Sequence, residues 1–395
     1  MIDRTRRLAR PTCLIASVGA PAIATMLACS ADGIGRGGVG GSVGIASAAD
    51  DAGAPGSSSG GEGSSAGVGT DDDVTGGGGP GPKFDLGDGD GSGASPDDGG
   101  CGTADCECTI PDHVPCDAGT TDPFRAMGLN CPGELQVQTS SQGPGGAIGL
   151  RSAFGGTNTF APREGSLYAV IGSGLVADLD LTTPNGDSNA FPTHCNDDLG
   201  NYDPGGTLPA PIQTEDVGGD CSTNAALIGT GDCSNTIHEQ FSQGGSAEDY
   251  VELRFEVDVP PDVISLSYDF AFFSVEYPVY FGSQFNDMYI GWLESELWTG
   301  NVSFDAMGNP ISLNAGFLQY KDDGGNAPEF SGTCMRQHAG TDWLTTTAGV
   351  MPGEHITVAF AIFDLSDSIL DSYAFIDNFG WGCDPTGVPS TEPEG

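Results

Sequence analysis

Oxygen-bearing side chains gather in two stretches of the chain that lie some eighty residues apart. Glu276, Asn286 and Asp287 occupy the first stretch, and Asp367 and Asp371 occupy the second. Grouped oxygen ligands of this kind are what Ca²⁺ requires, in sets of about six to eight that backbone carbonyls complete. The pattern predicts one calcium-stabilised region built from these five residues. The alternative is that the acids cap turns and accept hydrogen bonds from loop amides.

The charge balance favours a cation over an anionic partner. Residues 101–395 contain 42 acidic and 6 basic residues, which gives a net charge of −36. Such a chain has no surface that could neutralise phosphates, so we expect no nucleic-acid partner. It is also self-repelling unless cations bind to it.

Catalytic motifs are weak or incomplete. The segment 238–242 begins like a zincin helix, but Ser242 stands where the second histidine is needed. Arg336, His338 and Asp342 form a polar cluster that a disulfide-flanked surface loop also explains. The sequence therefore predicts a protein without enzymatic activity. An extracytoplasmic glycan hydrolase remains the alternative, because the separation of two catalytic carboxylates is not visible in a sequence.

The residues that would position these side chains read as β-strands joined by Gly- and Pro-rich loops. Residues 250–259 alternate apolar and charged side chains, which predicts one face in a core and the other in water. Eleven of the 32 aromatic residues fall between Tyr268 and Trp298, and we expect Tyr268, Phe270 and Phe272 to pack between two sheets. Further β-rich runs cover 167–171, 175–181, 263–273, 287–293, 357–363 and 372–379. The fold class expected is all-β, a jelly-roll-like β-sandwich with long loops.

The first thirty residues predict export and lipid attachment. A basic head is followed by an apolar run and by Met26-Leu27-Ala28-Cys29. This architecture is typical of a lipoprotein signal peptide over 1–28, with Cys29 acylated at the new N-terminus. Residues 29–100 are mostly Gly, Ser, Ala and Asp, so we expect a disordered acidic tether. An ordinary signal peptide cut near Ala28 is the alternative.

The cysteine count indicates disulfides. Cys13 leaves with the signal peptide and Cys29 takes the lipid, so ten of the twelve cysteines remain. An odd number on each side requires at least one bridge between the early and the late group, and Cys221–Cys233 is the favoured local pair. The early group is Cys101, Cys106, Cys108, Cys116 and Cys131; the late group is Cys195, Cys221, Cys233, Cys334 and Cys383.

Two blocks resemble a known family. Residues 272–287 (FFSVEYPVYFGSQFND) and 361–377 (AIFDLSDSILDSYAFID) are similar to the signature segments of the choice-of-anchor L domain. Arg163-Glu164-Gly165 and Gly172-Ser173-Gly174 are similar to its opening elements. The resemblance covers roughly 130–385 and implies a bacterial surface protein without an established catalytic activity.

These observations give a domain plan and a function. We expect a Cys-rich lead-in over 101–130, the β-sandwich domain over 131–385 and a disordered tail over 386–395. The protein would be exported to the cell envelope, held on its outer surface by lipid, and would present a binding or adhesion module for a glycan or protein ligand. A structural envelope component without a ligand is a further alternative.

Lipid attachment is testable by replacing Cys29 with serine. A thioether-linked lipid cannot form on serine, so Cys29→Ser is expected to move the protein from the membrane fraction to the soluble fraction. Fractionation followed by immunoblotting measures this shift. Unchanged membrane association of the variant would contradict the prediction.

Overall fold

A computed structural model describes residues 108–182, 192–385 and 387–394. Cys29, the expected tether and the cysteines at 101 and 106 lie outside the described residues, so the predictions made for them stay predictions. No helix within the described ranges is long and apolar enough to cross a membrane.

Antiparallel strands dominate the described chain. The helical elements are α1 (Pro123–Ala126), α2 (His238–Gly244) and three 3₁₀ turns, η1 (Val176–Asp180), η3 (Ala225–Leu227) and η4 (Pro328–Phe330). The strands are β1 (Gln138–Gln142), β2 (Ile148–Arg151), β3 (Tyr168–Gly172), β4 (Ala247–Asp258), β5 (Ser265–Ser274), β6 (Met288–Glu294), β7 (Thr299–Asn301), β8 (Ile311–Ser312), β9 (Tyr320–Lys321), β10 (Ala339–Gly340), β11 (Leu344–Gly349), β12 (His355–Leu365), β13 (Ser372–Gly382) and β14 (Ser390–Pro393).

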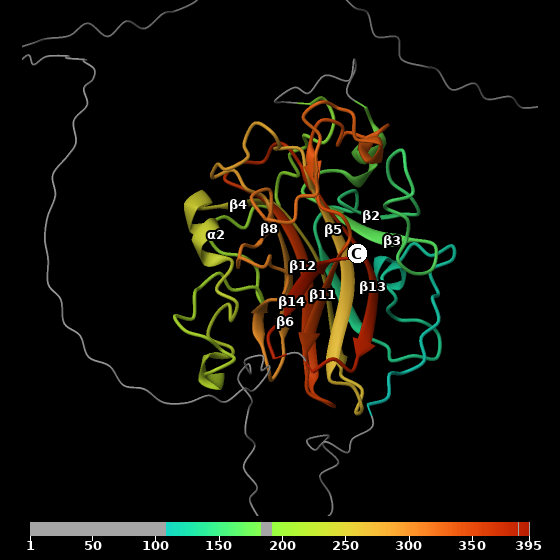
Figure 1. Ribbon diagram of the computed structural model, residues 1–395, viewed down its shortest axis with the longest axis vertical. Helices are drawn as coiled ribbons and strands as arrows, with labels where there is room; N and C mark the ends of the chain where they lie inside the picture. The colour runs from blue at the N-terminus through green and yellow to red at the C-terminus, as the bar shows by residue number, and fades with distance from the viewer. Residues whose placement is uncertain (1–107, 183–191, 386, 395) are drawn as a thin grey trace, which may run out of the picture. The chain divides into compact units, whose positions relative to one another are not determined.

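The strands form two sheets, and the protein is a β-sandwich as expected. The first sheet has the order β1-β4-β12-β6-β7, with β8 added beside β6. The second has the order β14-β11-β5-β13-β3-β2, with β10 and β9 continuing from β5. The long strands β6, β12, β11, β5 and β13 run upright in Figure 1, and α2 lies beside the outer face of the first sheet.

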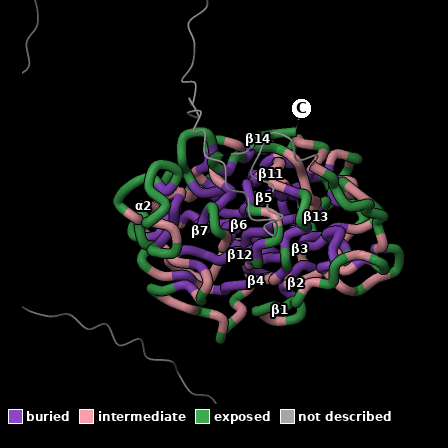
Figure 2. Tube along the Cα trace, turned by 90° about the horizontal axis from the view of Figure 1, so that it is seen from below, coloured by how far each residue is buried: buried purple, intermediate pink, exposed green. Residues whose placement is uncertain are grey.

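The main core lies between the two sheets. Phe255 on β4 and Phe360 on β12 pack against Tyr268, Phe270 and Phe272 on β5. The ring centroids of Tyr268 and Phe360 are 4.7 Å apart, an edge-to-face contact across the sandwich. Buried chain concentrates along the central strands in Figure 2. The prediction for the three alternating aromatics on β5 is confirmed.

The outer faces of both sheets are buried as well. Phe273 and Phe375 on the second sheet pack against Phe154 and Phe160 from the loop after β2. On the first sheet a separate apolar cluster includes Phe241 of α2 and Phe363 of β12. The prediction that β4 turns its charged face to water is therefore only partly right. Glu252 on that face is buried and pairs with Arg254.

Residues 175–181 correct the predicted strand list. They form the 3₁₀ turn η1, in which Val176 and Leu179 are the buried residues. Side chains three residues apart share one face of a 3₁₀ helix, so this pair reaches the core without an extended backbone. The prediction of a strand at 175–181, which was based on the apolar residues in this segment, is therefore wrong.

The two flanking segments belong to the fold. Phe124, Met127 and Leu129 of the lead-in join the main core, and the helix α1 begins at the N-cap Asp122. Residues 390–393 form β14, which pairs with β11 through Thr346 and Thr391. The disordered tail expected from 386 onward is wrong for these residues, because an unpaired edge of β11 is available to bind them.

Four disulfides brace the described chain. Cys221–Cys233 closes the local loop that the sequence favoured, and Cys108–Cys383 links the early and late groups as required. Both predictions are confirmed. Cys116–Cys131 and Cys195–Cys334 are the other two bridges.

Removing the long-range bridge should cost more stability than removing the local one. Cys108–Cys383 spans 275 residues and Cys221–Cys233 spans 12. Constraint of the unfolded chain grows with loop length, and losing a native bridge typically costs about 2–5 kcal/mol. The double serine variant at 108 and 383 is expected to melt at a lower temperature than the double serine variant at 221 and 233. Equal melting temperatures in calorimetry would contradict this ranking.

Candidate functional site

Five buried carboxyl groups close one end of the main core. We call Asp249, Glu276, Asp287, Asp364 and Asp371 the acidic layer; each is at most 1 % exposed. Three belong to the first sheet, where Asp249 is in β4, Asp364 is in β12 and Asp287 directly precedes β6. The other two flank strands of the second sheet, after β5 and before β13. Residues from both blocks that resemble the choice-of-anchor L domain thus meet in one place.

Strand alternation places Asp364 inside the sandwich. Phe360 and Ile362 on β12 face the main core, whereas Phe363 and Leu365 face the outer cluster. Asp364 therefore shares the inner face with Phe360 and Ile362. A register irregularity between Ile362 and Asp364 in the pairing with β4 marks the point where the core changes from apolar to acidic.

Asp287 connects the two sheets through hydrogen bonds. Its Oδ1 accepts from the backbone N–H of Leu365 at 3.1 Å, and its Oδ2 accepts from the hydroxyl of Ser372 at 2.7 Å. Asp371 accepts from the N–H of Asp197 and from the hydroxyl of Tyr373. Both carboxyl groups are held in fixed orientations by donors on several segments.

Other oxygens of the layer have no hydrogen-bond partner. Both side-chain oxygens of Asp364, Oε2 of Glu276 and Oδ2 of Asp249 are buried and unpartnered. Asp287 and the Ser173 hydroxyl are near enough to Asp364 to affect its pKa, yet neither makes a hydrogen bond of good geometry with it. Buried polar atoms are nearly always satisfied, so four open oxygens in one layer require an explanation.

Asp232 shows how this chain satisfies a buried carboxylate elsewhere. Its Oδ1 accepts from the N–H and hydroxyl of Ser234 and from the N–H of Asn301. Its Oδ2 accepts from the N–H groups of Thr236 and Ile237. The turn-capping interpretation of acidic residues therefore holds for Asp232, and it does not account for the open oxygens of Asp364.

Burial and, to a smaller extent, the charges of neighbouring carboxylates raise the pKa values of the layer. Burial, with the charges of Asp287 and Asp367, raises the pKa of Glu276 to about 11. Burial raises the pKa of Asp287 to about 7 against the hydrogen bonds that lower it. Burial also raises the pKa of Asp249 to about 7, and it raises the pKa values of Asp364 and Asp371 well above the usual range. The charges acting on these groups are those of other carboxylates.

The structure brings together four of the five residues predicted from the sequence. Glu276, Asp287 and Asp371 belong to the acidic layer, and Asp367 lies half-buried at its edge. Asn286 does not join them: its amide donates to Ser312, and its oxygen accepts from the N–H of Asn314. It braces a loop, as the alternative interpretation of these residues proposed.

Two members of the layer were missed. Asp364 lies in the second block, three residues before Asp367, but it is not among the five residues predicted; it is a residue of the strand β12. No pattern in the sequence marks Asp249 as a site residue. The other members of the layer lie on or beside other strands and reach Asp249 only in the folded chain. Its positive φ of 50° is a conformation that Asp adopts more readily than most residues.

The acidic layer is not a preformed metal cage. Among the described residues, the one set of three possible ligand atoms within 4.8 Å of one another comes from His113, Cys131 and Glu134. Cys131 is bonded to Cys116, so that set offers no thiolate. Cation binding in the acidic layer therefore requires its open carboxylates to rotate toward one another.

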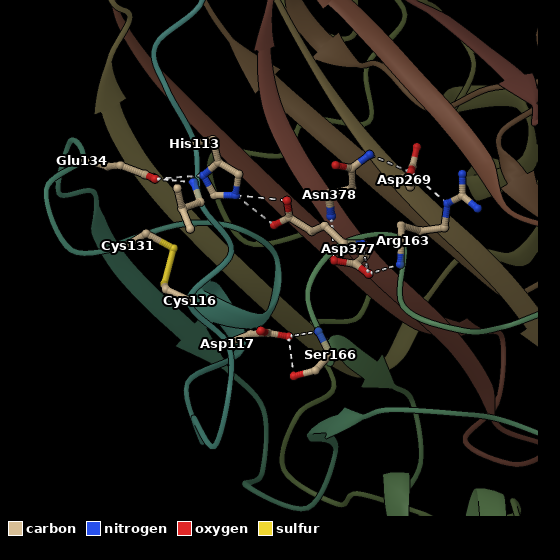
Figure 3. A network of polar contacts seen from close by, with 12 residues as sticks. His113, Cys116, Asp117, Cys131, Glu134, Arg163, Ser166, Asp269, Asp377 and Asn378 are labelled. Atoms are coloured by element: carbon tan, nitrogen blue, oxygen red, sulfur yellow. Dashed lines mark hydrogen bonds and ion pairs between the residues drawn. A yellow bond between two sulfur atoms is a disulfide. The ribbon is translucent and has the colours of Figure 1, made fainter.

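A separate cleft lies around His113. The His113 ring is held between two carboxylates: Nδ1 is 3.0 Å from Glu134 and Nε2 is 3.0 Å from Glu164 (Figure 3 shows the first contact). The cleft has a volume of about 690 Å³ and is walled by Trp381 and Phe379, among others. We call it the His113 cleft.

The lead-in and the loop before β3 hold the cleft in place. The Cys116–Cys131 bridge closes the lead-in, and Asp117 accepts a hydrogen bond from the N–H of Ser166 (Figure 3). Asp117 also accepts from the N–H of Leu167. A Cβ on Gly165 would lie 2.6 Å from the Asp117 carboxylate, so this close approach requires glycine. The tripeptide that resembles the family's opening element thus positions Glu164.

The remaining polar cluster from the sequence is structural. His338 is buried and its Nδ1 donates to the carbonyl of Tyr277 at 2.6 Å, and burial lowers its pKa. Asp342 accepts from the N–H of Trp343. His338 therefore braces the segment that follows β5, which supports the interpretation of this region as a structural loop.

Comparison with known proteins gives little guidance. No family model and no curated protein matches the chain. A solved structure of TmCBM61, a carbohydrate-binding module, in complex with β-1,4-galactotriose aligns with 62 % of this chain and 88 % of its own, at 8 % identity and a TM-score of 0.23. A likeness at that level carries no argument about function.

The acidic layer predicts an unusual pH dependence for protein freed of divalent cations. Carboxyl groups whose pKa rises on folding, to about 7 for Asp249 and Asp287, favour the protonated form in the folded state. The stability they contribute is fully present below the pKa of the unfolded carboxyl, 3.8, and is lost as the pH rises to the folded values. In chelator, the melting temperature is expected to fall by a few degrees between about pH 4.5 and 7.5.

Asp249→Asn supplies the control for this measurement. Asparagine keeps the oxygen that accepts from the N–H of Leu199 and tolerates a positive φ, yet it does not titrate. The variant is therefore expected to show a shallower pH dependence. A wild-type melting temperature that rises with pH over this range would contradict the prediction that ionisation of these groups destabilises the folded state.

Proposed function

We propose that this protein is a lipoprotein of the cell envelope that presents a β-sandwich binding module of the choice-of-anchor L type. The predicted signal peptide and Cys29 support the anchoring, and the two sequence blocks support the family. The disulfides are typical of an exported protein. The ligand site we propose is the His113 cleft, and its ligand is a neutral saccharide.

The composition of the cleft wall is the observation that carries this proposal. The half-buried Trp381 offers an apolar ring, while Asp112, Asn130, Glu134 and Asn378 offer hydrogen-bond acceptors and donors. A sugar ring has an apolar face and a rim of hydroxyl groups, so it matches such a wall. Binding sites of this kind combine aromatic surface with a few convergent polar groups.

Charge selects against acidic ligands. Three carboxylates and no arginine or lysine line the cleft within the described residues. The surrounding residues 101–395 carry a net charge of −36 from 42 acidic and 6 basic groups. An anionic polysaccharide would be repelled, whereas a neutral one would lose no electrostatic energy on approach.

The hydrolase alternative has one observation in its favour and one against it. Glu134 and Glu164 are two carboxylates in one cleft beside Trp381, as a glycosidase would require. The His113 ring, however, lies between them and is bonded to both, so it occupies the position that a glycosidic oxygen would need. Binding is the function that this arrangement favours.

A saccharide-binding assay tests the proposal. Calorimetric titration with a panel of neutral oligosaccharides is expected to find a ligand, and Trp381→Ala is expected to weaken its binding at least tenfold because the stacking surface is lost. Phe281→Ala is the matched control. Phe281 is an aromatic residue that is 47 % exposed and is not part of the cleft wall, so its removal should leave binding unchanged.

Three results would count against this function. Tighter binding of an acidic polysaccharide would contradict the ligand class, and equal effects of the two substitutions would contradict the site. Release of reducing sugar by the wild-type protein, abolished in Glu164→Gln, would favour the hydrolase alternative.

A further inference from the structure

We propose that the acidic layer is a Ca²⁺ site that joins the two sheets, with Asp364 at its centre and Glu276 and Asp249 as further ligands. The site lies at one end of the main core and shares no residue with the His113 cleft. Asp287, and Asp367 at its edge, complete the oxygen set.

The open oxygens are the first argument. Asp364 is 0 % exposed and both of its oxygens lack a partner, and one oxygen each of Glu276 and Asp249 is in the same state. Asp232 shows that this chain supplies up to five donors to a buried carboxylate where the structure needs one satisfied. An ion would give these oxygens a partner once the side chains rotate toward it, because no three carboxylates of the layer have ligand atoms within 4.8 Å of one another as they stand.

The hydrogen bonds of the layer also suit carboxylates in the ionised form. Asp249, Asp287 and Asp371 each accept a backbone N–H, from Leu199, Leu365 and Asp197 respectively, and hydrogen bonds of this kind favour the ionised carboxylate. No positive side chain is among the charges that act most strongly on Glu276, Asp364 and Asp371. Without a cation, burial therefore favours the protonated groups, and a bound cation would supply the counter-charge that lets them ionise.

The chemistry selects calcium among the common cations. The ligands are carboxylate oxygens, which suit hard divalent ions, and no thiolate or imidazole belongs to the layer. Ca²⁺ accepts irregular sets of about six to eight oxygens, including bidentate carboxylates, whereas Mg²⁺ demands near-octahedral geometry and retains water. A buried layer with several carboxylates on strands of fixed spacing fits the more flexible ion.

A melting experiment on the metal-depleted full chain tests the site. At constant ionic strength, Ca²⁺ at about a hundred times its dissociation constant is expected to raise the melting temperature by about 5 °C or more relative to chelator. Mg²⁺ at the same concentration is expected to give a clearly smaller rise. Identical curves in Ca²⁺ and chelator would overturn the proposal, and equal rises in Ca²⁺ and Mg²⁺ would overturn the assignment to calcium.

Asp364→Asn separates a metal ligand from a structural residue. In chelator, the variant should melt close to the wild-type temperature, because burial already favours the neutral form of Asp364 and asparagine is neutral as well. In Ca²⁺ it should lose most of the wild-type rise. Asp232→Asn is the matched buried control, expected to melt lower in both conditions while keeping the full rise. An Asp364→Asn variant that keeps the full rise would overturn the proposal.

A spectroscopic readout of the wild-type chain does not depend on the folding of a variant. Terbium(III) occupies oxygen sites of calcium, and Tyr373 is bonded to Asp371 of the layer at 2.9 Å. Excitation of tyrosine is expected to produce terbium emission that Ca²⁺ displaces competitively. Absence of sensitised emission, or emission that Ca²⁺ leaves unchanged, would overturn the site.

Discussion

Burial of both faces of both sheets is the constraint on which the rest of the structure depends. The inner faces share the core around Phe270 and Phe360, and each outer face has an apolar cluster of its own. Loops without regular hydrogen bonding must therefore cover wide areas of sheet. Their backbone groups need partners, and buried aspartates such as Asp117, Asp232 and Asp322 supply them by accepting from several N–H groups each. These aspartates are thus part of the loop structure that covers the sheets.

The acidic layer and the His113 cleft lie at opposite ends of the sandwich. β13 begins beside the layer at Ser372, which bonds Asp287, and reaches the cleft at Trp381. At about 3.3 Å per residue the two ends are roughly 30 Å apart. The two sites share no residue, so a substitution in one leaves the side chains of the other unchanged.

Local sequence patterns predicted what depends on near neighbours along the chain. The alternating aromatics of β5 and the short Cys221–Cys233 loop were correct for that reason. Residues 175–181 were misassigned because apolar alternation does not distinguish a strand from a 3₁₀ turn whose buried residues lie three apart. The strand β14 was missed because its pairing depends on an open edge of β11, which a sequence does not display.

The sites followed the same rule. Glu276, Asp287 and Asp371 lie within the two recognisable blocks and were found, but Asp364 of the second block was missed. Asp249 and the His113 cleft arise from segments that meet only after folding.

The Cys108–Cys383 bridge has a mechanical consequence. Cys108 is where the described chain begins, and its sulfur is bonded to the residue that follows β13, a strand flanked by β5 and β3. Tension applied through the N-terminal side of the chain would pass through a covalent bond into the middle of the second sheet. The lead-in residues that wall the His113 cleft would carry none of this load until the bridge was reduced, so shear at the surface would leave the cleft assembled.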